Sequence, residues 1–113
     1  MPLVVLVNRG TAGGAEALAQ VLRERRGAKL VGEPTPGFGL VATRFVLDGA
    51  AAIRLQTARM ESGLGAGWLG SGLAVDVHAP DVADLEFGAP GDASIEAGAR
   101  ILSRASRPEP KER

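Results

Sequence analysis

The chain has 113 residues and no net charge, because 13 basic residues balance 13 acidic ones, and 45% of its residues are hydrophobic. This length limits it to one soluble domain, and the balanced charge with few aromatic residues gives no support to nucleic-acid binding. The absence of cysteine and the single histidine exclude thiol catalysis, disulfides and metal sites built on either residue. No apolar run is long enough to span a membrane. From these features together we expect no metal, cofactor, nucleic-acid or membrane partner.

The first third of the sequence predicts a β-α-β unit. Residues 3–7 are a continuous apolar run, typical of a strand buried on both faces of a parallel sheet. Thr11 is expected to cap the helix that follows, and residues 29–33 are predicted to form the next strand. Apolar residues recur at helical spacing and predict the buried face of this helix: Ala15, Leu18, Ala19 and Leu22.

A hairpin and a further short strand are predicted next. Residues 40–47 and 51–58 flank Asp48-Gly49, a dipeptide typical of the turn between antiparallel strands. A glycine-rich loop with the only tryptophan, Trp68, follows the hairpin. Residues 73–77 are then predicted to form one more strand.

The C-terminal part predicts a closing helix. Asp92 or Ser94 is expected to cap it. Its apolar face consists of Ile95, Ala99 and Leu102. We therefore expect an α/β domain over residues 1–104, followed by a charged, disordered tail over residues 105–113.

Two further patterns are weak candidates for binding sites. Residues 65–70 match the letters of the dinucleotide-binding fingerprint, but a strand-like run follows them where the fingerprint needs a helix. Four acidic residues lie near His78, but their spacing matches no calcium loop: Asp76, Asp81, Asp84 and Glu86. We interpret the first pattern as a glycine-rich loop and the second as a solvated acidic connector.

Several blocks of sequence resemble the tail-specific, C-terminal processing proteases. Residues 4–22 are similar to the family's nucleophile segment, and residues 30–39 (LVGEPTPGFG) to the motif that carries its lysine. Residues 47–58 resemble its hairpin, and residues 72–77 (GLAVDV) the segment after it. Order and spacing agree over residues 3–104. The resemblance implies the Clp-protease/crotonase-like α/β fold, of which this chain matches only the C-terminal half of the catalytic domain.

The resemblance also implies a serine–lysine peptidase mechanism whose catalytic groups this chain lacks. The family's serine falls on Gly13, its lysine on Phe38, 25 residues further on, and its supporting glutamine on Ala42. Glycine has no hydroxyl to attack a carbonyl, and a phenyl ring accepts no proton. Thr11 stands two positions early and Lys29 begins the next strand, so neither is expected to substitute. The sequence therefore predicts a peptidase fold without peptidase chemistry.

Three interpretations of such a chain stay open. One is a non-catalytic peptide- or protein-binding module, because amides at a helix start can bind a carboxylate or a peptide carbonyl. The candidate residues are Thr11, Gly13, Gly14 and Glu16, of which Glu16 is also expected to stabilise the first helical turn. Another is self-association, or binding of a partner subunit, through surfaces that the missing half would cover. The last is a fragment of, or contributor to, a processing peptidase.

The cellular compartment is left open by the sequence. The start of the chain lacks the basic region and the long apolar run of a signal peptide. Many proteins of the family that the chain resembles work outside the cytoplasm.

Overall fold

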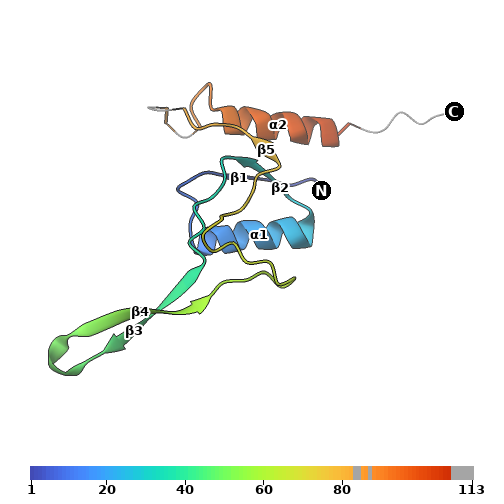
Figure 1. The fold of residues 1–113 in the computed structure, drawn as a ribbon. Helices are drawn as coiled ribbons and strands as arrows, with labels where there is room; N and C mark the ends of the chain where they lie inside the picture. The colour runs from blue at the N-terminus through green and yellow to red at the C-terminus, as the bar shows by residue number, and fades with distance from the viewer. Residues whose placement is uncertain (83–84, 87, 108–113) are drawn as a thin grey trace.

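The computed structural model describes residues 1–82, 85–86 and 88–107. Its body has three layers, in which helix α1 (Gly14–Arg26) covers one face of a parallel sheet and helix α2 (Ala93–Ala105) covers the other (Figure 1). The sheet has the strand order β1-β2-β5, formed by Val4–Val7, Lys29–Gly32 and Val77–His78. The predicted α/β class and the predicted β-α-β unit are confirmed.

The core lies between this sheet and α1. Strands β1 and β2 pair in parallel from Val4–Lys29 to Val7–Gly32, so both end at the same edge of the sheet. Leu30 is fully buried, and the loop between β4 and β5 adds Trp68 and Leu73 to the same cluster. Burial of each large apolar side chain contributes about 1.5–3 kcal/mol. This small core fixes the positions of the turns that leave β1 and β2.

The buried face of α1 agrees with the prediction at Ala19 and differs from it at Ala15 and Leu18. Its buried residues are Glu16, Ala19 and Gln20, whereas Leu18 is 60% exposed and Ala15 is exposed. The difference has a tertiary cause, because Glu16 is hydrogen-bonded to groups inside the body. Drawing this polar side chain inward rotates Leu18 toward solvent.

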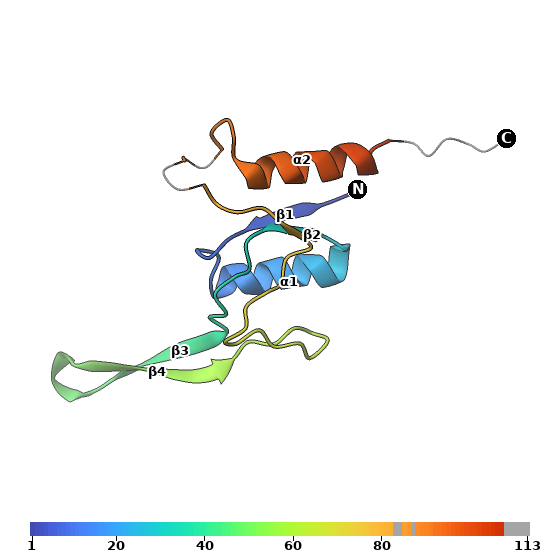
Figure 2. The same cartoon turned by 45° about the horizontal axis from the view of Figure 1, so that its top comes forward.

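Strands β3 (Leu40–Val46) and β4 (Ala52–Arg59) form a separate antiparallel hairpin whose bounds lie within one residue of the predicted ones. The hairpin projects from the body on the side away from α2 (Figures 1 and 2). Every residue of β4 is exposed. A two-stranded hairpin is marginally stable in water on its own, so this one depends on its two connections to the body.

The strand predicted over residues 73–77 is wrong in its bounds, because only Val77–His78 pairs with β2. Residues 73–76, which precede this strand, are held partly by hydrogen bonds between side chains and the backbone. Leu73 N donates to Thr35 Oγ1 at 2.8 Å, and Leu30 N donates to Asp76 Oδ2 at 2.8 Å. These side-chain oxygens accept from backbone amides that a longer strand would pair with carbonyl groups of a neighbouring strand.

Helix α2 begins after Asp92, one of the two predicted caps. Asp92 Oδ1 accepts hydrogen bonds from Ser94 N at 3.1 Å and from Ile95 N at 3.2 Å. These are two of the amides that a helix start leaves without an intrahelical partner. The predicted apolar positions of α2, Ile95, Ala99 and Leu102, face β1. Together with Val4 and Leu6 of β1 they line a hollow between the helix and the strand.

Replacing Asp92 by alanine is expected to lower the melting temperature more at pH 7 than at pH 2. The Ser94 hydroxyl, followed by the backbone amides of Gly88 and Ile95, holds the pKa of Asp92 below its ordinary value. A carboxyl whose pKa is lowered in the folded state stabilises the fold above its unfolded pKa of about 3.9 and loses this contribution as pH falls through the folded pKa. Thermal unfolding of Asp92→Ala and of the unchanged chain at both pH values measures the difference. Equal shifts at pH 7 and pH 2 would contradict it.

The predicted tail begins where α2 ends. The helix extends to Ala105, one residue beyond the predicted domain boundary at residue 104, and residues 108–113 of the predicted tail lie outside the described residues, as does Asp84 of the acidic connector. Over the described ranges, no three His, Cys, Asp or Glu side chains gather as ligands for a metal ion. None of the described helices is both long and apolar enough to cross a bilayer.

Candidate functional site

A tight turn follows β1 and leads the chain to Gly13. Asn8 N donates to Thr11 Oγ1 at 3.1 Å, Thr11 N donates to Asn8 O at 3.0 Å, and Gly10 N donates to Asn8 Oδ1 at 2.9 Å. The prediction that Thr11 caps α1 is wrong, because its hydroxyl closes this turn and Gly13 is the residue before the helix. The turn therefore fixes where Gly13 stands at the end of β1.

Gly13 has a backbone conformation that favours glycine. Its φ is 59° and its ψ is −116°, and side-chain-bearing residues rarely adopt a positive φ. A Cβ built on Gly13 would meet only Phe38 O within 4 Å, at 3.9 Å. The position thus has room for a side chain but holds its backbone in a strained region.

Glu16 joins the turn after β1 to the loop after β2. Its side chain has no exposed surface. Glu16 Oε2 accepts a hydrogen bond from Gly13 N at 2.9 Å, while Oε1 accepts from Thr35 Oγ1 at 2.5 Å and from Gly37 N at 2.8 Å. Thr35 Oγ1 in turn accepts from Leu73 N at 2.8 Å. One buried carboxylate therefore holds two loops together, and Thr35 extends the link to a third segment.

The loop that carries Phe38 is packed closely against the segment around Trp68. Gly37 has φ 85°, and a Cβ there would lie 2.7 Å from Gly72 N and 2.9 Å from Trp68 O. On the other side of Phe38, a Cβ on Gly39 would lie 3.4 Å from Trp68 Nε1. The Phe38 side chain itself is 66% exposed. The backbone at Phe38 is thus fixed between two glycines while its ring faces solvent.

Gly13 and Phe38 are brought together although 25 residues separate them in sequence. The contact between the Cβ position of Gly13 and Phe38 O, and the shared hydrogen bonds of Glu16, place the two loops side by side. Ala42 follows on β3, opposite Gln56. None of the three positions carries a hydroxyl, an amine or an amide side chain.

Lys29 and Thr11 do not restore the missing groups. Lys29 pairs with Val4 at the start of the two strands, so the length of β1, about 10 Å at 3.3 Å per residue, separates it from the turn. The Thr11 hydroxyl accepts from Asn8 N, and Lys29, the one lysine among the described residues, lies at the other end of β1. The arrangement therefore offers no hydroxyl next to a proton acceptor of the serine–lysine type.

The four residues predicted to bind a ligand lie together at the start of α1, but most of their polar groups are bonded within the chain. The Gly13 amide and both Glu16 oxygens bond one another or the loop after β2, and the Thr11 hydroxyl closes its own turn. Gly14 is exposed, with open space at its Cβ position. Ligand binding here stays a prediction, in which a ligand would meet Gly14 first and compete with Glu16 for the Gly13 amide.

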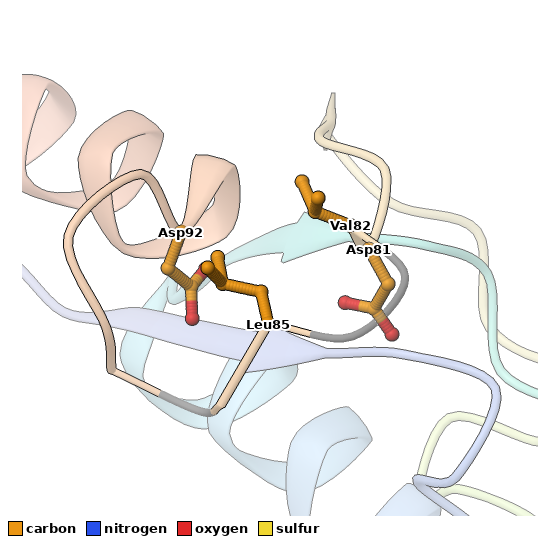
Figure 3. A pocket seen from close by; sticks show the side chains of 4 residues that line it. All are labelled: Asp81, Val82, Leu85 and Asp92. Atoms are coloured by element: carbon orange, nitrogen blue, oxygen red, sulfur yellow. The ribbon is translucent and has the colours of Figure 1, made fainter.

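A separate hollow lies at the start of α2, lined by Asp81, Val82, Leu85 and Asp92 (Figure 3). Two carboxylates in one hollow invite comparison with an acid–base pair. However, Asp81 Oδ2 accepts from Asn8 Nδ2 at 2.9 Å, and Asp92 caps α2. Both carboxylates therefore serve structural hydrogen bonds, which agrees with the interpretation of this segment as a connector.

Comparison with known families places this turn and loop in context. The model of peptidase family S41 matches residues 1–79, a range that includes Gly13, Phe38 and Ala42. The chain belongs to peptidase family S41. The family that the sequence motifs resemble is thus confirmed.

The S41 relatives are C-terminal processing proteases of bacteria and chloroplasts. The carboxyl-terminal-processing protease of Synechocystis sp. is 36% identical over 104 residues, which are 90% of this chain and 24% of the relative. The carboxy-terminal processing protease of Bacillus subtilis is 38% identical over 76% of this chain and 19% of its own length. The structure of the photosystem II D1 C-terminal processing protease superposes with a TM-score of 0.66 at 36% identity, over 71% of this chain and 21% of that one. The chain thus spans about a quarter or less of the length of these S41 proteins.

The role of Glu16 was not evident from the sequence. An acid in the first turn of a helix has a sufficient local explanation in the helix dipole, so nothing in residues 11–26 alone indicates the buried hydrogen bonds from Thr35 and Gly37. The available signal was that Thr35 and Gly37 belong to the same motif block as Phe38. Glu16 lies in the first motif block, with Gly13, and its hydrogen-bond partners Thr35 and Gly37 lie in the second, with Phe38. If the two blocks must be held together, a polar side chain such as Glu16 is a candidate for that role.

Proposed function

We propose that this chain is a non-catalytic S41-family domain that acts as a structural or peptide- and protein-binding module. The observation that carries the proposal is the pair Gly13 and Phe38, which meet where the family resemblance puts the serine and the lysine. Hydrolysis by a serine–lysine pair needs a hydroxyl that attacks the carbonyl and a neutral amine that takes its proton. Gly13 and Phe38 supply neither group. A cleavage assay with an unfolded protein tests the proposal, and we expect no products.

The hydrogen bonds around Gly13 give further support. Backbone amides that stabilise an oxyanion must be free to donate to it in the transition state. The amide of Gly13 is donated to Glu16 Oε2 at 2.9 Å, inside the chain. The turn therefore serves to hold the two loops together.

Restoring the two family residues is expected to give no measurable peptidase activity. In Gly13→Ser with Phe38→Lys, the serine would stand at φ 59°, at a cost of about 1–3 kcal/mol. The lysine would replace a side chain that is 66% exposed, so water would keep its amine protonated. The single variants Gly13→Ser and Phe38→Lys are the controls. Turnover by the double variant alone would show that these two residues are the only parts lacking for catalysis.

Peptide binding can be measured separately from catalysis. Fluorescence anisotropy with labelled peptides that end in a free or an amidated carboxyl group distinguishes recognition of the carboxylate from recognition of the chain. Weaker binding of the amidated peptide would favour a site at the helix start near Gly14. If neither peptide binds, the peptide-binding half of the proposal is wrong and a structural role is left.

The second candidate function is a contribution to a larger processing peptidase. It is favoured by the match to only 24% of the length of the Synechocystis protease. The attacking group and its base would then have to come from residues outside this chain. Proteolysis by the protein isolated from its native source, with a mass greater than 11.6 kDa, would favour this candidate over the first.

A further inference from the structure

Strand β1 leaves one edge of the parallel sheet open. In the part of the chain that the structure describes, β1 pairs with β2 alone. Val7 O accepts from Glu33 N at 3.0 Å, so Val7 directs its backbone groups toward β2. Successive residues of a strand direct these groups to opposite sides, so the N–H and C=O groups of Val4 and Leu6 point to the open edge. The strand contains no charged residue and no proline, the residues that keep an edge from pairing with another strand.

An apolar side of α2 lies next to the same open edge. Helix α2 runs alongside β1 (Figure 2). Its residues Ile95, Ala99 and Leu102 line a hollow together with Val4 and Leu6 of β1. Ile95 is 41% exposed and Leu6 is 39% exposed. We call these five residues the open flank.

The strand edge is self-complementary about a two-fold axis. A second copy of β1, antiparallel to the first along this edge, pairs Val4 with its Leu6 and Leu6 with its Val4. Each pair exchanges two backbone hydrogen bonds, so all the edge groups of both residues are satisfied. The axis of this arrangement passes at Val5. A Cβ on Gly98 would lie 3.2 Å from both Val4 Cγ1 and Leu6 Cδ2, so Gly98 of α2 lies over the same point of the strand.

The same pairing brings two copies of α2 to the distance at which helices pack. The helix contacts both β1 and β2, so its axis lies above the gap between them, about 2.4 Å inside β1. Paired strands are about 4.8 Å apart, which puts the two helix axes about 10 Å apart, within the range of packed helices. Because Gly98 lies near the axis, Ala99 meets Ala99 of the second copy, and Ile95 meets its Leu102. The small side chain thus lies where the helices come closest.

No charge opposes this contact, because every residue of the open flank is apolar. We infer that the chain forms a two-fold symmetric dimer in which the two β1 strands pair edge to edge and the two α2 helices pack along their open flanks. The dimer has one sheet of six strands, three from each copy. This assembly goes beyond the proposed function, since it holds whether or not the chain cleaves or binds peptides.

The area of the contact fits a weak, specific dimer. The 13 residues of α2 are about 20 Å long, and the four residues of β1 are about 13 Å long. Strips about 10 Å wide along both elements cover on the order of 700 Å² in projection over the two copies, and the accessible area removed from water is larger, on the order of 1,000 Å². Specific interfaces begin near this size, so we expect a dissociation constant in the micromolar range.

Opposite charges at the two-fold axis test the contact between the helices. Ala99 is exposed in the single chain, so Ala99→Lys and Ala99→Glu should leave its fold unchanged. Each variant alone places like charges face to face, and analytical ultracentrifugation of the full chain should find a dissociation constant at least about ten-fold higher. An equimolar mixture of the two variants should dimerise again, because the mixed dimer pairs opposite charges. Arg104→Glu lies on the side of α2 away from the open flank by helical spacing and should dimerise as the unchanged chain does.

Val4→Pro tests the pairing of the strands. Val4 is the first residue of β1, and its N–H points away from β2. A proline there removes a hydrogen bond of the dimer and none between β1 and β2. By symmetry two of the four backbone bonds between the copies are lost, so the dissociation constant should rise at least about ten-fold. The matched control is Val4→Ala, which shortens the side chain but keeps the N–H, and it should dimerise more tightly than Val4→Pro.

Three results would each overturn the inference. The first is an unchanged chain that stays monomeric at concentrations up to about 100 µM. The second is dimerisation of Ala99→Lys or Ala99→Glu alone as strong as that of Arg104→Glu, or a mixture of the two that stays monomeric while each is folded by circular dichroism and Trp68 fluorescence. The third is equal dimerisation of Val4→Pro and Val4→Ala, which would show that the strand edges do not pair.

Discussion

Replacing Glu16 by alanine is expected to lower the free energy of unfolding by about 3–5 kcal/mol. The carboxylate accepts hydrogen bonds from Gly13 N, Thr35 Oγ1 and Gly37 N, and it is fully buried. A buried donor that loses its acceptor costs about 1–3 kcal/mol. The alanine would leave two such buried donors, at Thr35 and Gly37, and the half-buried amide of Gly13. The alternative explanation, an acid in the first helical turn, accounts for about 0.3–1 kcal/mol. Denaturant unfolding, followed by the fluorescence of buried Trp68, measures the loss.

Glu96→Ala is the matched control for this prediction. Glu96 is also an acid in the first turn of a helix, but its side chain is 55% exposed and its partner Arg100 lies one helical turn away. Its removal should cost less than about 1 kcal/mol. Glu16→Gln should fall between the two alanine variants, because an amide keeps one acceptor oxygen but turns a donor toward Gly13 or Gly37. Similar losses for Glu16→Ala and Glu96→Ala would show that Glu16 is only a helix-start acid.

Gly72→Ala is expected to prevent folding, with a loss above about 4 kcal/mol. A Cβ on Gly72 would lie 1.8 Å from Thr35 O and 2.7 Å from the Thr35 carbonyl carbon. Relief of this clash requires movement of the loop that presents Thr35 and Gly37 to Glu16. The failure to fold would be seen as loss of the native circular dichroism spectrum and of the fluorescence emission typical of buried Trp68.

The matched control is Gly65→Ala in the same loop. Gly65 has φ 80°, close to the 72° of Gly72, but a Cβ there meets nothing within 4 Å. Only the strain of a left-handed alanine is then added, about 1 kcal/mol. If both alanine variants lose the same free energy of unfolding, backbone strain explains the need for glycine at residue 72. The close contact with Thr35 would then not be the reason.

Elements with strong local signals could be predicted from the sequence. The apolar run before Asn8 and the Asp48-Gly49 turn gave β1 and the hairpin nearly to the residue. The bounds of the strand predicted at residues 73–77 could not be found from the sequence, because side-chain oxygens of Thr35 and Asp76 accept hydrogen bonds from the backbone amides of Leu73 and Leu30. Such bonds join residues 38 and 46 positions apart, and no local pattern reveals them.

The site divides in the same way. The family resemblance assigned Gly13 and Phe38 to the serine and lysine positions of two motif blocks, and the structure shows the loops that carry them in contact. The buried face of α1 was predicted correctly at Ala19 and incorrectly at Leu18, because hydrophobic spacing alone ranks Leu18 above Glu16. The hydrogen bonds from Thr35 and Gly37 outweigh that preference, and they are tertiary in origin.

Mass spectrometry of an unfolded protein after long incubation with the purified chain measures the absence of peptidase chemistry most directly. The carboxyl-terminal-processing protease of Synechocystis sp. serves as the active reference. With Gly13 and Phe38 at the two family positions, we expect the same substrate masses as in buffer alone. Products that increase with the concentration of the chain and disappear in Thr11→Ala would contradict this, because they would identify Thr11 as a nucleophile.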